Sequence, residues 1–201
     1  MAARINRWLR RVPPWLLYIG VALWAGWLFY NGVVGQLGAD PVEALELAYG
    51  DLALKLLIVG LAVTPLRKWT GVSLIRFRRA IGVTAFFLVL AHFLVWAVLD
   101  VQTLGRVWAD ILKRPYVTIG MSAFVLLIPL AATSNNWSVR KLGPAWRRLH
   151  RLAYPAALLA AVHYIWLVKG FELEPYIYAA LIGALLLARV EWRPRRGPAR
   201  A

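Results

Sequence analysis

The chain has 201 residues, of which 61% are hydrophobic and 16% charged, and its mean hydropathy is +0.62. A soluble domain is about 45 to 50% apolar and about 25% charged, so this composition excludes an ordinary water-soluble protein and places the chain in a bilayer. The formal net charge of +15 would suggest nucleic-acid binding in a soluble protein, but in a membrane protein basic residues also set orientation.

Apolar segments along the chain predict an all-α integral membrane protein, since each crossing takes about 20 residues. The six candidate crossings are residues 15–34, 47–66, 80–99, 116–133, 149–168 and 175–188. The first shows no small-residue cleavage site, so we expect it to be retained as a helix. Residues 101–113 carry apolar side chains at helical spacing and predict an amphipathic helix on the outer membrane surface.

These segments predict a six-helix bundle with both termini in the cytoplasm. Residues 1–14 then form a basic N-terminus, residues 15–190 the membrane domain, and residues 191–201 a basic tail. Nineteen of the 24 basic residues fall on the cytoplasmic side in this arrangement, and eight of the nine acidic residues fall on the other side. Basic residues concentrate on the cytoplasmic side of membrane proteins, so the positive charge predicts orientation and contact with lipid, and we expect no nucleic-acid partner.

Cysteine is absent, which removes disulfides, thiolate metal sites, covalent haem attachment and cysteine-ligated iron–sulfur clusters. His92, His150 and His163 remain as the good transition-metal ligands. His92 follows Arg79 by 13 residues and His163 follows His150 by 13, so each lies roughly 20 Å above the cytoplasmic end of its helix. Two imidazoles at matched depth on different helices are what a bis-histidine haem requires, although hydrogen-bonding struts between helices are the alternative.

His150 is expected at the cytoplasmic mouth of the bundle, among basic residues. At the matching depth, the start of the helix predicted over residues 80–99 offers the preceding Arg78 and Arg79, and no histidine. His150 is therefore a candidate for a second haem, an FMN or a quinone site, or else an interfacial histidine in a stripe that binds anionic lipid.

Several stretches together resemble the MsrQ family, the haem-binding membrane subunits of bacterial periplasmic methionine sulfoxide reductase systems, within the ferric-reductase-like transmembrane superfamily. The resemblance covers most of the chain, from about residue 37 to residue 170. The stretches are Leu37-Gly-Ala-Asp-Pro-Val42, Thr64-Pro-Leu66, Ile75-Arg-Phe-Arg-Arg-Ala-Ile-Gly82, Ala91-His92, Arg114-Pro-Tyr-Val-Thr-Ile-Gly120, Thr133-Ser134, Lys141-Leu-Gly-Pro-Ala-Trp-Arg-Arg-Leu-His-Arg-Leu-Ala-Tyr-Pro155 and Val162-His-Tyr-Ile-Trp166.

The resemblance implies a haem b protein of the bacterial inner membrane that also uses FMN. It implies electrons taken from the quinone pool or a cytosolic flavin reductase and passed to a periplasmic molybdopterin enzyme that reduces methionine sulfoxide. The superfamily's histidine positions map onto His92, His150 and His163, and the fourth falls near Arg78 or Arg79. A whole ferric reductase is not expected, because the chain has no G-x-G-x-x-G fingerprint and no room for a FAD/NADPH domain.

Basic side chains toward both ends of the predicted bundle are candidate contacts for cofactor oxyanions. Lys55 is placed to serve haem propionates on the outer side, with pairing to Asp51 as the alternative. Arg76, Arg78 and Arg79 suit an FMN phosphate or inner propionates, with topology and lipid contact as the alternative. The preferred hypothesis is an electron-transfer subunit whose substrate chemistry belongs to a partner, and the competing one is a cofactor-free structural, transport or proton-relay subunit.

Overall fold

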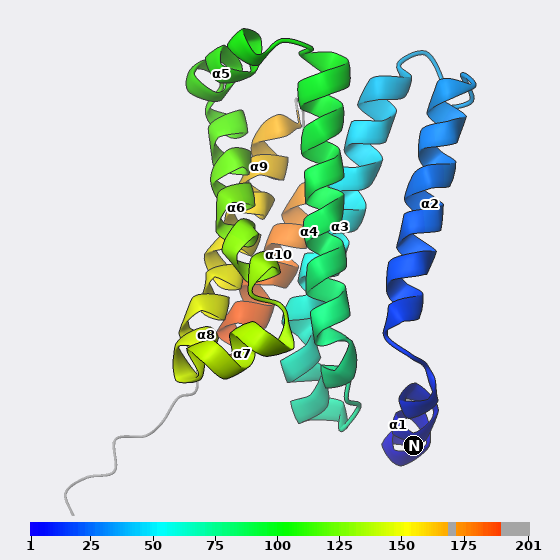
Figure 1. Cartoon of the computed structure of the whole chain (residues 1–201), viewed down its shortest axis with the longest axis vertical. Helices are drawn as coiled ribbons and strands as arrows, with labels where there is room; N and C mark the ends of the chain where they lie inside the picture. Colours follow the sequence, from blue (N-terminus) through cyan, green and yellow to red (C-terminus); the bar gives the residue numbers. More distant parts are fainter. Residues whose placement is uncertain (169–171, 190–201) are drawn as a thin grey trace, which may run out of the picture.

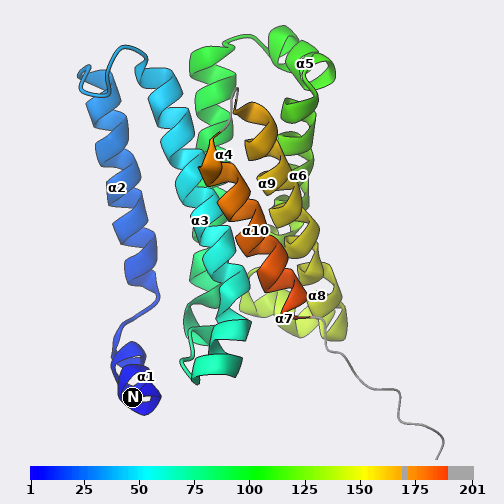
Figure 2. The ribbon, with the colours of Figure 1, turned by 180° about the vertical axis from the view of Figure 1, so that it is seen from behind.

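The computed structural model describes residues 1–168 and 172–189, and every regular element in this part of the chain is helical. Elongated helices stand side by side in an up-and-down bundle (Figure 1). The helices of the bundle are α2 (Trp15–Val33), α3 (Pro41–Thr70), α4 (Arg78–Leu94), α6 (Pro115–Ala132), α9 (Ala153–Leu167) and α10 (Leu173–Leu187). Figure 2 shows α10 crossing obliquely in front of α3 and α9, whereas α2 stands at the edge of the bundle.

Short elements cover the two ends of the bundle. One end carries α5 (Leu104–Lys113) and the turn between α2 and α3 (Figure 1). The other end carries α1 (Ala2–Arg11), η1 (Ile75–Phe77), α7 (Asn136–Leu142), α8 (Pro144–Leu149) and η3 (His150–Leu152). Helix α4 continues into a π-helical turn, η2 (Val95–Asp100), before the chain reaches α5.

Charge divides along the bundle axis. The acidic side chains of the described residues lie toward the end that carries α5, which we call the acidic end; they are Asp40, Glu43, Glu46, Asp51, Asp100, Asp110, Glu172 and Glu174. The opposite end, which we call the basic end, carries the arginines and lysines of α1, of the α3–α4 connection, of α7 and of α8. The described residues therefore give the bundle a net negative charge at the acidic end, which also carries Lys55, Arg106, Lys113 and Arg114, and a positive charge at the basic end.

Local sequence explains where the longest helix begins and ends. Asp40 caps α3, because its carboxylate accepts a hydrogen bond from the Glu43 amide at 3.0 Å, and Pro41 occupies the first helical turn. Gly71 ends α3 with a φ of +74°, a left-handed conformation that favours glycine. These signals set the 30-residue length of α3, which exceeds the predicted segment 47–66 at both ends.

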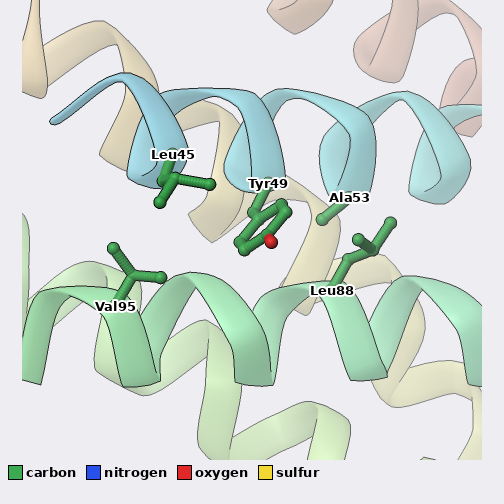
Figure 3. Packing of buried hydrophobic residues seen from close by; sticks show 5 residues of the cluster. All are labelled: Leu45, Tyr49, Ala53, Leu88 and Val95. Atoms are coloured by element: carbon green, nitrogen blue, oxygen red, sulfur yellow. The ribbon is translucent and has the colours of Figure 1, made fainter. Parts of the chain in front are cut away.

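Helices α3 and α4 pack through small and branched side chains. Leu45, Tyr49 and Ala53 of α3 face Leu88 of α4 and Val95 of η2 (Figure 3). The Tyr49 hydroxyl donates a 2.7 Å hydrogen bond to the carbonyl of Ala25, which ties α2 to the same core. A second core cluster joins α3 to α9 and α10 and contains Leu54, Leu61, Ala157, Ala161 and Ile182.

The prediction of an all-helical membrane protein is confirmed, with a smaller number of clear crossings. Within residues 1–168 and 172–189, four helical runs are long and apolar enough to span a bilayer; they are Trp15–Val33, Pro41–Thr70, Ile75–Asp100 and Pro115–Ala132. Helices α9 and α10 have 15 residues each, because residues 150–152 form a 3-10 turn and α10 ends at Leu187. The predicted tail 191–201 lies outside the described residues.

Candidate cofactor site

A large cavity lies between α3, α4, α6 and α9 and reaches the acidic end of the bundle. Its volume is about 990 Å³, at the upper end of the range typical of small-molecule and cofactor pockets. Apolar and aromatic side chains line part of it, including Phe93, Trp96 and Phe124. Phe93 and Phe124 stack with ring centres 5.3 Å apart, so they present a flat apolar wall.

His92 of α4 and His163 of α9 meet inside this cavity. Their ring centres are 6.3 Å apart and their planes are inclined by 80°. The structure thus brings together two histidines that are 71 positions apart in the sequence and come from two different helices. His150 does not line the cavity.

Each of these two histidines is oriented by a backbone carbonyl of a neighbouring helix. His92 Nδ1 lies 2.9 Å from the Glu46 carbonyl oxygen of α3, and His163 Nδ1 lies 2.8 Å from the Tyr116 carbonyl oxygen of α6. A carbonyl oxygen only accepts, so in each ring the proton is on Nδ1, which donates. Nε2 of each neutral imidazole is then left with the lone pair that binds a metal.

A glycine opposite each ring makes this close approach feasible. A Cβ added at Gly50 would lie 3.1 Å from His92 Nδ1, and one added at Gly120 would lie 2.9 Å from His163 Nδ1. Gly50 follows Glu46 by four residues and Gly120 follows Tyr116 by four, so each glycine lies one helical turn beyond the carbonyl that accepts. The two halves of the site therefore repeat one arrangement on two helix pairs.

The geometry fits a metal held between two imidazoles. An imidazole nitrogen binds a first-row metal such as zinc at about 2.0 to 2.1 Å, so two bonds in line put the ring centres roughly 6 Å apart. The spacing of 6.3 Å matches this requirement. No group of three or more His, Cys, Asp or Glu side chains in the described part of the chain is arranged to hold a bare metal ion. Two histidines in a cavity that also has apolar and aromatic lining residues suit a macrocycle that already supplies the other metal ligands.

The cavity wall toward the acidic end is strongly charged. Its carboxylate residues are Asp40, Glu43, Glu46, Asp51, Asp100, Glu172 and Glu174. Arg114, in the turn between α5 and α6, is the one arginine or lysine that lines the cavity among the described residues. The Tyr116 hydroxyl, 3.4 Å from the guanidinium, raises the pKa of Arg114 further, so this side chain stays cationic.

Lys55 forms an ion pair and lies outside the cavity lining. Its Nζ lies 2.6 Å from Asp51 Oδ2, and Lys55 does not line the cavity. Tyr178 of α10 joins the pair, because its hydroxyl donates to Glu174 at 2.6 Å and lies 3.3 Å from Asp51 Oδ1. The structure therefore contains the ion pair between Lys55 and Asp51 that was the alternative interpretation of Lys55.

His150 belongs to a separate local network near the basic end. The Thr133 hydroxyl donates to the Pro129 carbonyl at 2.6 Å and therefore accepts from His150 Nε2, 3.1 Å away. The His150 ring stacks on Trp146 with ring centres 3.9 Å apart. Trp146 in turn donates to the Thr133 carbonyl at 2.9 Å. In this arrangement Nε2 of His150 carries a proton, and Nδ1 is the nitrogen left with a lone pair.

Arg78 and Arg79 lie at the start of α4, at the basic end, and both are exposed. Arg78 lies near enough to His150 to act on it electrostatically. Arg78 and His150 thus both lie toward the basic end, whereas His92 and His163 line the cavity.

The backbone carbonyls and glycines that orient the two histidines were not predicted from the sequence. The accepting carbonyls carry no side-chain signal, but Gly50 and Gly120 stand inside apolar segments where glycine weakens a helix, which is a usable signal of close approach. Arg114 stands in one of the stretches that carry the family resemblance, yet its role depends on the α5–α6 turn, which folds it over the cavity.

Comparisons with known proteins agree with these features. A family profile described as ferric reductase like transmembrane component matches residues 47–161. Proteins of Brucella ovis, Brucella canis and Brucella suis, each named protein-methionine-sulfoxide reductase heme-binding subunit MsrQ, are 51% identical to this chain over 177 residues. The matches cover 88% of this chain and 80% of each relative. No solved structure matches the chain.

The paired glycines lead to a testable prediction. Gly50→Ala or Gly120→Ala pushes a methyl group against the imidazole that it faces and displaces the ring from its carbonyl. Loss of a hydrogen bond that orients a ligand histidine typically lowers the affinity of a metal site about 10- to 100-fold. We therefore expect the affinity for haem to fall by about this factor, which lowers the haem content of protein purified at limiting haem.

Gly82→Ala on α4 is the matched control, because nothing lies within 4 Å of its added Cβ. Haem content is read from the visible absorption of protein purified in parallel. Unchanged haem content in Gly50→Ala and Gly120→Ala, or an equal loss in Gly82→Ala, would contradict the positioning role of the two glycines.

Proposed function

This chain belongs to the MsrQ family of ferric-reductase-like transmembrane proteins, and we propose that it is a haem b electron-transfer subunit with His92 and His163 as the axial ligands. The observation that supports this assignment most is the pair of imidazoles whose Nδ1 protons are held by carbonyls and whose rings meet in one cavity. The names of the Brucella relatives, which are heme-binding subunits, support the same cofactor.

The haem supplies a one-electron couple on its iron when bound. The chain's own contribution is to fix the ligands and to shield them. The Glu46 and Tyr116 carbonyls set the tautomer and orientation of the two rings and raise their basicity. If His92 and His163 both held the iron, no ligand position would be open for oxygen or substrate, so we propose electron transfer without catalysis on a substrate by this chain.

Arg114 is proposed to hold the propionates at the mouth of the cavity. Propionates are anionic, and the carboxylates around the mouth repel them. Arg114 is the one arginine or lysine among the described residues that lines the cavity, so it is the favourable partner, in addition to its ion pair with Asp110 Oδ2 at 3.4 Å. This residue takes the place that sequence reasoning assigned to Lys55, which is paired with Asp51.

We propose an orientation in which the basic end faces the cytoplasm and the acidic end faces the periplasm of a bacterial inner membrane. The separation of charge along the bundle supports this orientation. It requires α9 and α10 to complete six crossings with both termini in the cytoplasm. The haem site would then lie near the periplasmic side, and electrons would leave toward that side.

The donor and the acceptor are proposed from the family. Electrons would come from the quinone pool or a cytosolic flavin reductase, and would go to a periplasmic molybdopterin enzyme that reduces methionine sulfoxide in proteins. The names of the relatives, which place them in a methionine sulfoxide reductase, support the identity of that acceptor.

We also propose a second carrier at the basic end, FMN, a quinone or a second haem, near His150 with Arg78 and Arg79. The grouping of Arg78 with His150 supports the location, and arginine presents a rigid fork to phosphate oxygens. For a second haem, Nδ1 of His150 would have to be the ligand, or the hydrogen bond to Thr133 would have to be broken. Flavin released by acid extraction of freshly purified protein would support FMN.

A cofactor-free structural, transport or proton-relay subunit is the competing function, with the histidines as struts or proton carriers. The visible spectrum of the purified protein separates the two. A Soret band with stoichiometric haem is the expected result. Fully inserted protein without a Soret band would support the competing function.

Histidine substitutions test the ligand assignment. We expect His92→Ala and His163→Ala each to abolish the low-spin haem spectrum, because each removes one of two axial ligands. We expect His150→Ala to retain most of that spectrum, since His150 does not line the cavity. Equal loss in all three variants, or an intact spectrum in either of the first two, would refute the assignment.

Substitution of Arg114 tests the propionate contact. Arg114→Gln removes a charge-assisted hydrogen bond worth about 1.5 to 3 kcal/mol, so haem affinity should fall about 10- to 100-fold. Loss of a nearby positive charge favours the ferric state, so the haem midpoint potential should fall, by roughly 60 mV for each tenfold change in preference. Lys113→Gln, an exposed neighbour outside the cavity, is the control for both measurements. Identical potentials for Arg114→Gln and the wild-type protein would count against the contact.

A further inference from the structure

A second, smaller cavity lies at the basic end of the bundle, between α1 and the connection from α3 to α4. Its volume is about 180 Å³. The residues that line it are Asn6, Leu9 and Arg10 of α1 together with Ser73, Arg76 and Phe77. It shares no lining residue with the histidine cavity and includes neither His150 nor Arg78.

The walls of this cavity are held together by tertiary hydrogen bonds. The Asn6 side chain donates to the Gly71 carbonyl at 2.9 Å and accepts from the Ser73 amide at 2.9 Å. Arg76 donates to the Arg10 carbonyl near the last turn of α1. Gly71 also lets α1 approach, since a Cβ there would lie 3.4 Å from the Cβ of Ala2. Helix α1 is therefore docked on the α3–α4 connection, and the cavity is part of the fold.

The cavity carries donors and positive charge, and no carboxylate among the described residues lines it. Arg10 and Arg76 place two guanidinium groups on it, and within the described part of the chain one of their N–H groups is engaged, by the Arg10 carbonyl. The Ser73 hydroxyl has no hydrogen-bond partner among the described residues. The ion pairs of residues 1–168 and 172–189 both lie toward the acidic end, and none of the described acidic side chains lines this cavity.

The side chains that line the cavity, and its place beside α1, indicate which class of ligand it binds. Two arginine forks and a hydroxyl suit a tetrahedral oxyanion, which arginine binds with paired hydrogen bonds. Leu9 and Phe77 give the cavity an apolar side. Helix α1 combines four arginines with the exposed apolar side chains Ile5 and Trp8, a composition typical of helices that lie in the membrane interface.

We propose that this cavity binds a phosphate group through Arg10, Arg76 and Ser73, and that α1 thereby fixes the basic end of the bundle to a phosphate-bearing ligand. The phosphate comes from an anionic phospholipid headgroup or from a soluble phosphoester, which present the same oxygens to the site. The proposal does not depend on haem or on the ligand roles of His92 and His163.

Native mass spectrometry of the full chain in detergent, titrated with phosphatidylglycerol, tests the site. Arg10→Gln removes one guanidinium but keeps the backbone carbonyl that Arg76 holds, so α1 should stay docked. We expect its affinity for the lipid to fall about 10- to 100-fold, the effect of losing a charge-assisted hydrogen bond. Ser73→Ala should weaken binding roughly threefold, as for a neutral hydrogen bond.

Arg4→Gln is the matched control, because Arg4 is exposed on the same helix but does not line the cavity. We expect it to bind phosphatidylglycerol like the wild-type protein. Inorganic phosphate added to the complex with phosphatidylglycerol identifies the source of the phosphate group. If the lipid stays bound, the site takes a lipid headgroup. If phosphate displaces the lipid, the site takes a soluble phosphoester. Equal losses in Arg4→Gln and Arg10→Gln, or no loss in Arg10→Gln, would overturn the proposal.

Discussion

The site depends on one interaction made twice, the hydrogen bond from a histidine Nδ1 to a backbone carbonyl of a neighbouring helix. His92 of α4 is held by Glu46 of α3, and His163 of α9 by Tyr116 of α6. Neither ring is oriented by its own helix, so the packing of α3 on α4 and of α6 on α9 positions both lone pairs. Tight packing in these two helix pairs, which Gly50 and Gly120 permit, is therefore a functional constraint as well as a structural one.

The second feature that organises the molecule is the separation of charge between its two ends. The acidic end surrounds the mouth of the histidine cavity, where Arg114 stands among carboxylates. The basic end has no acidic side chain among the described residues, so the anions that neutralise its arginines and lysines come from lipid or solvent. This polarity accounts for the proposed orientation, and it also accounts for the donor-rich cavity between α1 and the α3–α4 connection.

Much of the fold and part of the site were accessible from the sequence. Apolar segments gave the helices, and counting residues from Arg79 and His150 gave the matched levels of His92 and His163, because helix rise is constant. Lys55 pairs with its i,i+4 carboxylate and does not line the cavity, and its contact with a cofactor stays a prediction. Arg114 escaped prediction because its position over the cavity depends on a turn, and helical periodicity says nothing about turns. The docking of α1 depends on the side chain of Asn6, which has no periodic signal.

Electron paramagnetic resonance of the purified, oxidised wild-type protein shows whether His92 and His163 bind one haem between them. We expect a low-spin ferric signal from haem present in at least stoichiometric amount, because two imidazole ligands would leave no weak or open position. A high-spin signal from all of the bound haem would contradict it, and so would a well-folded protein that takes up no haem.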